Sequence, residues 1–149
     1  MGTTGDIKPA SIWTGWLTAA SLGVALLGLS LLLAPGLTLQ GFSLLFYGNP
    51  GRLQALGSEA GHYITLVHAV LGAVMFGWGL MLAVVVKRLL AQGSKLGWQL
   101  VAGSLAAWSV PDTTYSLISG YWQNALLNIG FALLFAVPLA ATRKSCLRT

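Results

Sequence analysis

The sequence predicts an all-α integral membrane protein, in which one transmembrane domain over residues 1–149 forms a four-helix bundle. Three observations predict it: the shortage of charge, the length of the apolar runs and the placement of the basic residues. Of the 149 residues, 56% are hydrophobic and 7% are charged. Soluble domains carry roughly 25% charged residues. So few charges cannot coat a water-facing surface, which excludes a soluble globular domain, a disordered chain and a nucleic-acid binder that folds in water.

Four apolar runs are each about 20 residues or longer, the length that a helix needs to cross the hydrocarbon layer. Helices are expected because backbone polar groups find no partner in lipid. Only Ser119–Tyr121 separates the last two runs, so these two helices form an antiparallel hairpin. Pro35 follows the first run where a signal-peptide cleavage site would need small residues, so this run is expected to be retained. The four spans cover about residues 12–34, 61–86, 96–118 and 121–142.

The basic residues predict the orientation of the spans. Lys and Arg accumulate on the cytoplasmic side of membrane proteins. If both termini are cytoplasmic, seven of the eight basic residues lie on that side, and Arg52 alone lies on the other. The seven are Lys8, Lys87, Arg88, Lys95, Arg143, Lys144 and Arg148.

The first external loop is long and contains the apolar stretch Gly41–Tyr47. This stretch is too apolar for a free loop and too short to span. We expect it to lie in the membrane interface or to dip into the mouth of the bundle. A turn is expected at Gly48–Gly51.

Small residues recur at helical spacing and predict where the spans pack. Lipid tails are as apolar as leucine, so helices associate in membranes chiefly where small residues allow close backbone approach. The first span offers Thr14, Thr18, Ser21, Ala25 and Gly28; the second offers Gly61, Thr65, His68, Gly72, Met75 and Gly79; the third offers Gly97, Ser104 and Ala107 or Trp108.

The polar residues inside the predicted spans form the candidate ligand or proton site. Asp112 shares one face of the third span with Tyr115 or Ser116 and with Ser119. Asn124 and Asn128 share one face of the fourth span. With a rise of about 1.5 Å per residue, Asp112 and Asn128 lie roughly 10 Å inside the external end, and His68 lies at a similar level. The cluster is either structural, held by hydrogen bonds between helices, or a site for a ligand or a proton.

Arg52, Glu59 and His62 are placed at the external mouth. The spacing of Glu59 and His62 matches the Glu-x-x-His pattern of di-iron bundles, but that chemistry needs more carboxylates than this chain supplies. His62 and His68 lie about 120° apart around one helix, so they cannot bind one metal from one face. We therefore expect no metal and no cofactor. Cys146 is the only cysteine of the sequence, so no intrachain disulfide can form. It is expected to be a free thiol in a frayed tail or a site of palmitoylation.

Trp108–Ala125 and Ala136–Leu139 resemble a class of small bacterial four-span membrane proteins without a defined activity. The resemblance covers the last third of the chain. It implies a bacterial inner-membrane location and assigns no catalytic residue.

Three functions are compatible with these patterns. The first is a non-enzymatic accessory, assembly or sensing subunit that contacts the lipid bilayer and either other membrane subunits or a second copy of itself. The second is a small proton-coupled transporter that uses the Asp112 cluster. The third is a membrane enzyme acting on a lipid or a quinone through Glu59, His62 and Asp112. No short catalytic or nucleotide-binding motif occurs, which favours the first.

Overall fold

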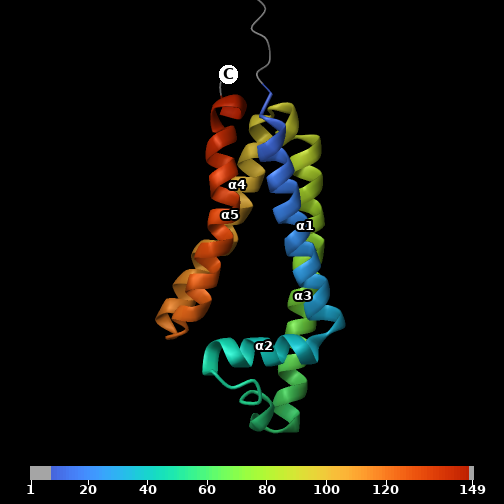
Figure 1. The fold of residues 1–149 in the computed structure, drawn as a ribbon, viewed down its shortest axis with the longest axis vertical. Helices are drawn as coiled ribbons and strands as arrows, with labels where there is room; N and C mark the ends of the chain where they lie inside the picture. Colours follow the sequence, from blue (N-terminus) through green and yellow to red (C-terminus); the bar gives the residue numbers. More distant parts are fainter. Residues whose placement is uncertain (1–7, 148–149) are drawn as a thin grey trace, which may run out of the picture.

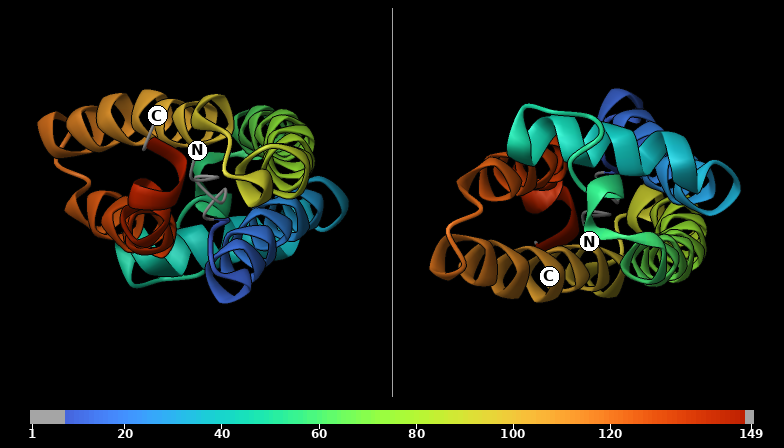
Figure 2. Two further views of the ribbon diagram at one scale, coloured as in Figure 1. Left: turned by 90° about the horizontal axis from the view of Figure 1, so that it is seen from above. Right: turned by 90° about the horizontal axis from the view of Figure 1, so that it is seen from below.

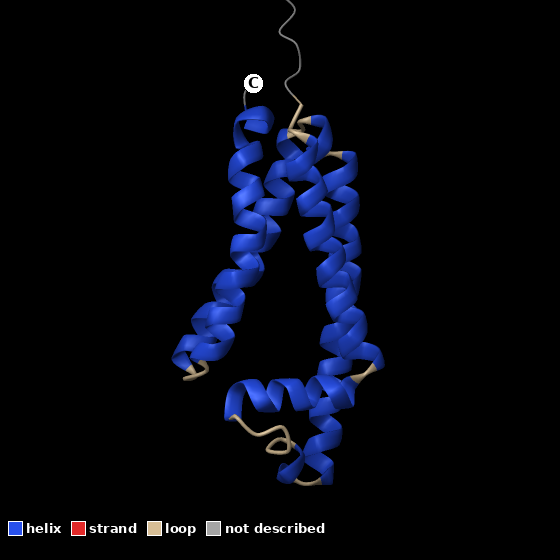
Figure 3. Cartoon of the chain, viewed as in Figure 1, coloured by secondary structure: helices blue, strands red, loops and turns tan. Residues whose placement is uncertain are grey.

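The computed structural model describes residues 8–147, and helices account for all regular structure in this range (Figure 3). The all-α prediction is thereby confirmed. The long helices are α1 (Ser11–Leu33), α2 (Pro35–Tyr47), α3 (Ser58–Arg88), α4 (Lys95–Ile118) and α5 (Trp122–Leu147). Two short 3-10 helices, η1 (Gln54–Leu56) and η2 (Leu90–Gln92), lie in the connections.

The long helices form two pairs, α1 with α3 and α4 with α5 (Figure 1). The pairs meet at the end of the molecule that holds the start of α1 and the end of α5, and they diverge toward the other end. Helix α2 lies across this open end, nearly perpendicular to the others (Figure 2). The molecule therefore has a narrow end, where the pairs pack together, and a wide end, which α2 covers.

Three helices, α1, α3 and α5, are long and apolar enough to cross a membrane. Helix α4 is also long, at 24 residues. It carries Ser109, Asp112 and other polar residues in its second half, which lower its hydropathy. Large apolar side chains on the outer surface, such as Leu26 and Leu126, remain exposed. The chain is thus a membrane protein with at least three helices fit to span.

The pairing of α1 with α3 depends on glycine, as the small-residue stripes predict. A Cβ atom added to Gly72 would lie 2.5 Å from the carbonyl oxygen of Gly28, and one added to Gly79 would lie 2.5 Å from the amide nitrogen of Ala25. Real Cβ atoms do not approach other atoms so closely. Gly61 has open space around it, so the seam does not extend to the start of α3.

A buried core joins the two pairs at the narrow end. Phe135 from α5 is its largest fully buried side chain, and it belongs to one cluster with Leu17 from α1 and Val101 from α4. The indole N–H of Trp98 donates to the carbonyl oxygen of Leu139 at 2.8 Å, which ties α4 to α5. This core explains why the pairs converge here.

Cys146 lies in this core and not in a frayed tail. Helix α5 continues to Leu147, and Cys146 is 2% exposed. Its thiol faces the carbonyl oxygen of Leu90 at 3.9 Å. The expectation of a frayed tail was wrong because the last turn of α5 packs against η2.

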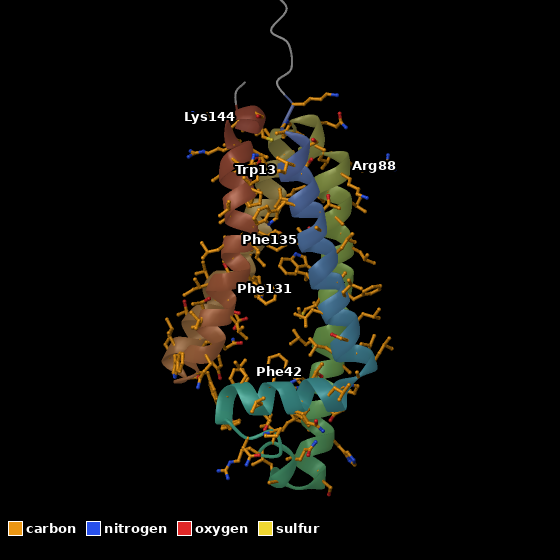
Figure 4. The ribbon with its side chains drawn as sticks, viewed as in Figure 1. Trp13, Phe42, Arg88, Phe131, Phe135 and Lys144 are labelled. Atoms are coloured by element: carbon orange, nitrogen blue, oxygen red, sulfur yellow. The ribbon has the colours of Figure 1, made fainter. Side chains whose placement is uncertain are left out.

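The basic residues divide between the two ends as the sequence suggests. Arg88 and Lys144 lie at the narrow end (Figure 4). Arg52 lies in the turn between α2 and η1, on the connection beyond the wide end. Arg148 lies outside the described residues. The charge asymmetry along the molecule is therefore a property of the fold, whichever side of the membrane each end faces.

Candidate functional site

Helix α2 forms the floor of the wide end. Its first residue, Pro35, suits a helix start because the missing N–H would have no partner there. The apolar stretch Gly41–Tyr47 is the second half of this helix, which begins earlier than the stretch and lies across the mouth between the two helix pairs. The Ser43 hydroxyl donates to the carbonyl oxygen of Asn49 at 2.6 Å and accepts from the amide of Leu53 at 3.2 Å. These bonds fold the connection that follows α2 back onto the helix.

The far end of α2 contacts the start of α5. The hydroxyls of Tyr47 and Tyr121 share a hydrogen bond of 3.2 Å. The Tyr121 ring meets Phe46 edge to face, with ring centroids 5.6 Å apart. The Gln123 amide donates to the carbonyl oxygen of Phe46 at 3.5 Å. These contacts bridge the two helix pairs at the end where the pairs themselves diverge.

The bridge is sensitive to alkaline pH. The hydrogen bond with Tyr121 raises the pKa of Tyr47 above its ordinary value, and burial adds to the effect. A raised tyrosine pKa means that the folded state favours the neutral phenol. The contribution of the bridge is fully present below the ordinary tyrosine pKa and is lost as pH rises through the raised value.

Asp112 forms a hydrogen-bonded cluster between α4 and α5. The Asn124 amide donates to Asp112 Oδ1 at 3.0 Å and to the Ser116 hydroxyl oxygen at 2.8 Å. The Ser116 hydroxyl lies 2.7 Å from the carbonyl oxygen of Asp112 and 3.3 Å from its Oδ1, so it can donate to either. Tyr115 is 72% exposed and is not part of the cluster. The predicted site thus places Asp112 beside Asn124, with Ser116 in place of Tyr115.

A cavity of about 650 Å³ lies between the two helix pairs, above α2. Phe131 and Phe135 from α5 are directed toward it from one side, and Phe42 faces it from the floor (Figure 4). All five long helices contribute to its wall. The lining residues are mostly apolar, and four have polar side-chain oxygen or amide groups: Ser104, Asp112, Asn124 and Asn128.

Asn128 is the polar residue of this wall without a partner. It is 4% exposed, and its Nδ2 atom makes no hydrogen bond to any described residue. It lies one turn deeper along α5 than Asn124, as the shared helix face predicts. Asn128 makes no hydrogen bond to Asp112, and the amide that bonds Asp112 is that of Asn124, one turn nearer the start of α5.

His68 does not join Asp112. Its Nδ1 atom lies 2.8 Å from the carbonyl oxygen of Ile64 in its own helix, and its ring packs edge to face on Phe42 at 5.3 Å. His68 is not among the residues that line the cavity with Asp112 and Asn128. His68 therefore supports the floor helix.

Arg52, Glu59 and His62, assigned to the external mouth, are all exposed. Glu59 and His62 occupy the first turns of α3, in the part that extends beyond α2. None of the three lines the cavity. Within residues 8–147, no group of three or more His, Cys, Asp or Glu side chains is arranged to hold a metal ion.

Two tryptophans complete the wall and were not among the sequence candidates. Trp78 from α3 and Trp108 from α4 contact each other on the cavity wall, with ring centroids 5.8 Å apart. The signal was present in the sequence. Membrane proteins concentrate Trp near the ends of spans, whereas these two residues lie well inside their helices.

Comparisons with protein-family models, with curated proteins and with solved structures gave no match.

Proposed function

We propose that this chain is a four-span bacterial inner-membrane protein that binds a small apolar molecule in the cavity between its helix pairs, as a non-enzymatic sensing or accessory subunit. The observation that carries this proposal is the cavity itself. It is concave, mostly apolar and rich in aromatic side chains, with a few polar groups, as small-molecule sites are. Its volume of about 650 Å³ lies within the usual range of such sites, roughly 300–1,000 Å³.

The proposed topology has α1, α3, α4 and α5 as spans, with both termini cytoplasmic. Helix α4 pairs with α5, and three of the polar residues that lower its hydropathy, Ser104, Asp112 and Ser116, face α5 or the cavity. The described basic residues at the helix ends favour a cytoplasmic narrow end. In this orientation α2 lies near the external surface, and the cavity lies within the membrane on its cytoplasmic side.

Filling the cavity should abolish binding. Ala107 lines the cavity, and its neighbour Ala106 is equally exposed but does not line it. We expect Ala107→Trp to remove the binding of small aromatic probes, because the indole would occupy the space. Ala106→Trp should bind like the wild type. The measurement is equilibrium dialysis of the protein in lipid nanodiscs against dibenzylamine and dibenzyl ether, with protein-free nanodiscs subtracted. If neither probe binds, or if Ala107→Trp binds both as well as the wild type does, the proposed ligand site is wrong.

A second function, a proton-coupled carrier, is favoured by one observation: Asp112 is an ionisable group on the cavity wall. Ionisable residues inside membranes often carry protons. Under this function, proton entry into proteoliposomes loaded with a pH-sensitive dye exceeds that into protein-free liposomes, and it varies between pH 5 and 8. Asp112→Asn should reduce it to the protein-free rate, and Glu59→Gln should not. Equal rates in the wild type and Asp112→Asn would exclude this function.

A further inference from the structure

Charge on the cavity wall has one sign. Asp112 is the single acidic residue among the lining side chains, and no Lys, Arg or His is among them. Both side-chain donors that reach its carboxyl group, Asn124 and Ser116, contact Oδ1, so Oδ2 is left without a donor among the described residues. A carboxylate at membrane depth is costly unless it finds a partner. The wall therefore favours a cation and disfavours an anion.

Aromatic rings surround the same space from both helix pairs. Trp78 and Trp108 are inclined by 50° to each other, and Phe42, Phe131 and Phe135 complete the wall. The face of an aromatic ring attracts a cation that lies within about 6 Å of its centre, most strongly for Trp, and the attraction grows when water is excluded. A cation with an apolar body would contact aromatic ring faces and the Asp112 carboxylate in the same cavity.

Asn128 indicates that the bound molecule also has a polar group. Its side chain is almost completely buried, and no described residue bonds its amide nitrogen. A buried polar group without a partner destabilises the structure. An amide can both donate and accept hydrogen bonds. The unpaired Nδ2 is a donor and requires an acceptor on the ligand, whereas an ammonium group near Asp112 can donate only to the Asn128 amide oxygen.

We propose that the cavity binds a lipophilic organic cation, namely a protonated amine on an aromatic or branched apolar body. The ammonium group pairs with Asp112 Oδ2, and the apolar body packs against the cavity-facing surfaces of Trp78 and Trp108. This inference rests on the proposed ligand site and adds the charge of the ligand. A fatty acid or a phosphate-bearing lipid does not fit, because no basic side chain faces the cavity.

The test compares dibenzylamine, which is protonated at pH 7, with dibenzyl ether, which has the same shape and no charge. We expect the amine to bind the wild type in nanodiscs about tenfold more tightly than the ether, after subtraction of protein-free nanodiscs. Asp112→Asn should abolish this preference and leave ether binding unchanged. Glu59→Gln, which removes a carboxylate outside the cavity, should retain the preference for the amine.

Trp108→Leu provides a second variant in which the Asp112 cluster stays intact. It should reduce amine binding severalfold more than ether binding, because leucine retains apolar contact without the aromatic face. If the two probes bind equally well to the wild type and Ala107→Trp blocks both, the ligand site stands and the cation proposal is overturned. If the amine is preferred equally in the wild type, Asp112→Asn and Trp108→Leu, the cation proposal is overturned as well.

Discussion

Replacing Gly72 with leucine is expected to separate α1 from α3. The seam leaves no room at this position, since an added Cβ would lie 2.5 Å from the Gly28 carbonyl oxygen and 2.8 Å from the Leu31 Cβ. The nearest of these atoms belongs to the backbone, so no side-chain movement relieves the clash. Overpacking a tight interior costs about 1–3 kcal/mol and sometimes more. We expect Gly72→Leu to lower the free energy of unfolding by about 3 kcal/mol, at the upper end of that range.

Gly77→Leu is the matched control. Gly77 lies in the same helix, and an added Cβ there meets nothing within 4 Å. The free energy of unfolding of Gly77→Leu should differ from that of the wild type by at most about 0.5 kcal/mol, as for most substitutions at exposed positions. The measurement is an SDS titration of the purified protein in mild detergent, followed by tryptophan fluorescence. Similar losses for both variants would mean that the seam is not the contact that holds α1 to α3.

Much of the fold could be predicted from the sequence, because its elements are local. Length and apolarity define the long helices, and small residues at helical spacing identify Gly28 and Gly72 as members of packing stripes. The shared faces of α4 and α5 bring Asp112 close to the Asn124 turn. Each of these depends only on the period of the helix and on residue type.

The cavity could not be predicted, because it depends on how the two pairs diverge. No residue spacing encodes the angle between pairs that pack at one end only. The same divergence places His68 against Phe42 on the floor helix, away from Asp112. Helix α2 begins at Pro35, directly after the first span, and its extent depends on its packing against α3 and on the contact of Tyr47 with Tyr121.

The second prediction with a large expected effect concerns the membrane topology. A cysteine is labelled from a given side of the membrane almost completely or hardly at all. Gln92 lies in η2, just before α4, and Ser119 directly follows α4. Both residues are exposed, and they flank α4 at its opposite ends. If α4 spans the membrane, cysteines at these two positions lie on opposite sides. The native thiol is removed by Cys146→Ala, which suits a buried side chain better than a charged or larger replacement. Gln54→Cys, in the connection after α2, reports the side on which the floor helix lies.

The most direct measurement is therefore the labelling of these single-cysteine variants with a membrane-impermeant maleimide, in spheroplasts before and after permeabilisation. We predict that Ser119→Cys and Gln54→Cys react in intact spheroplasts, and that Gln92→Cys reacts only after permeabilisation. Reaction of Gln92→Cys and Ser119→Cys from the same side would contradict the account, because α4 would then not cross the membrane and the cavity could not lie among four spans.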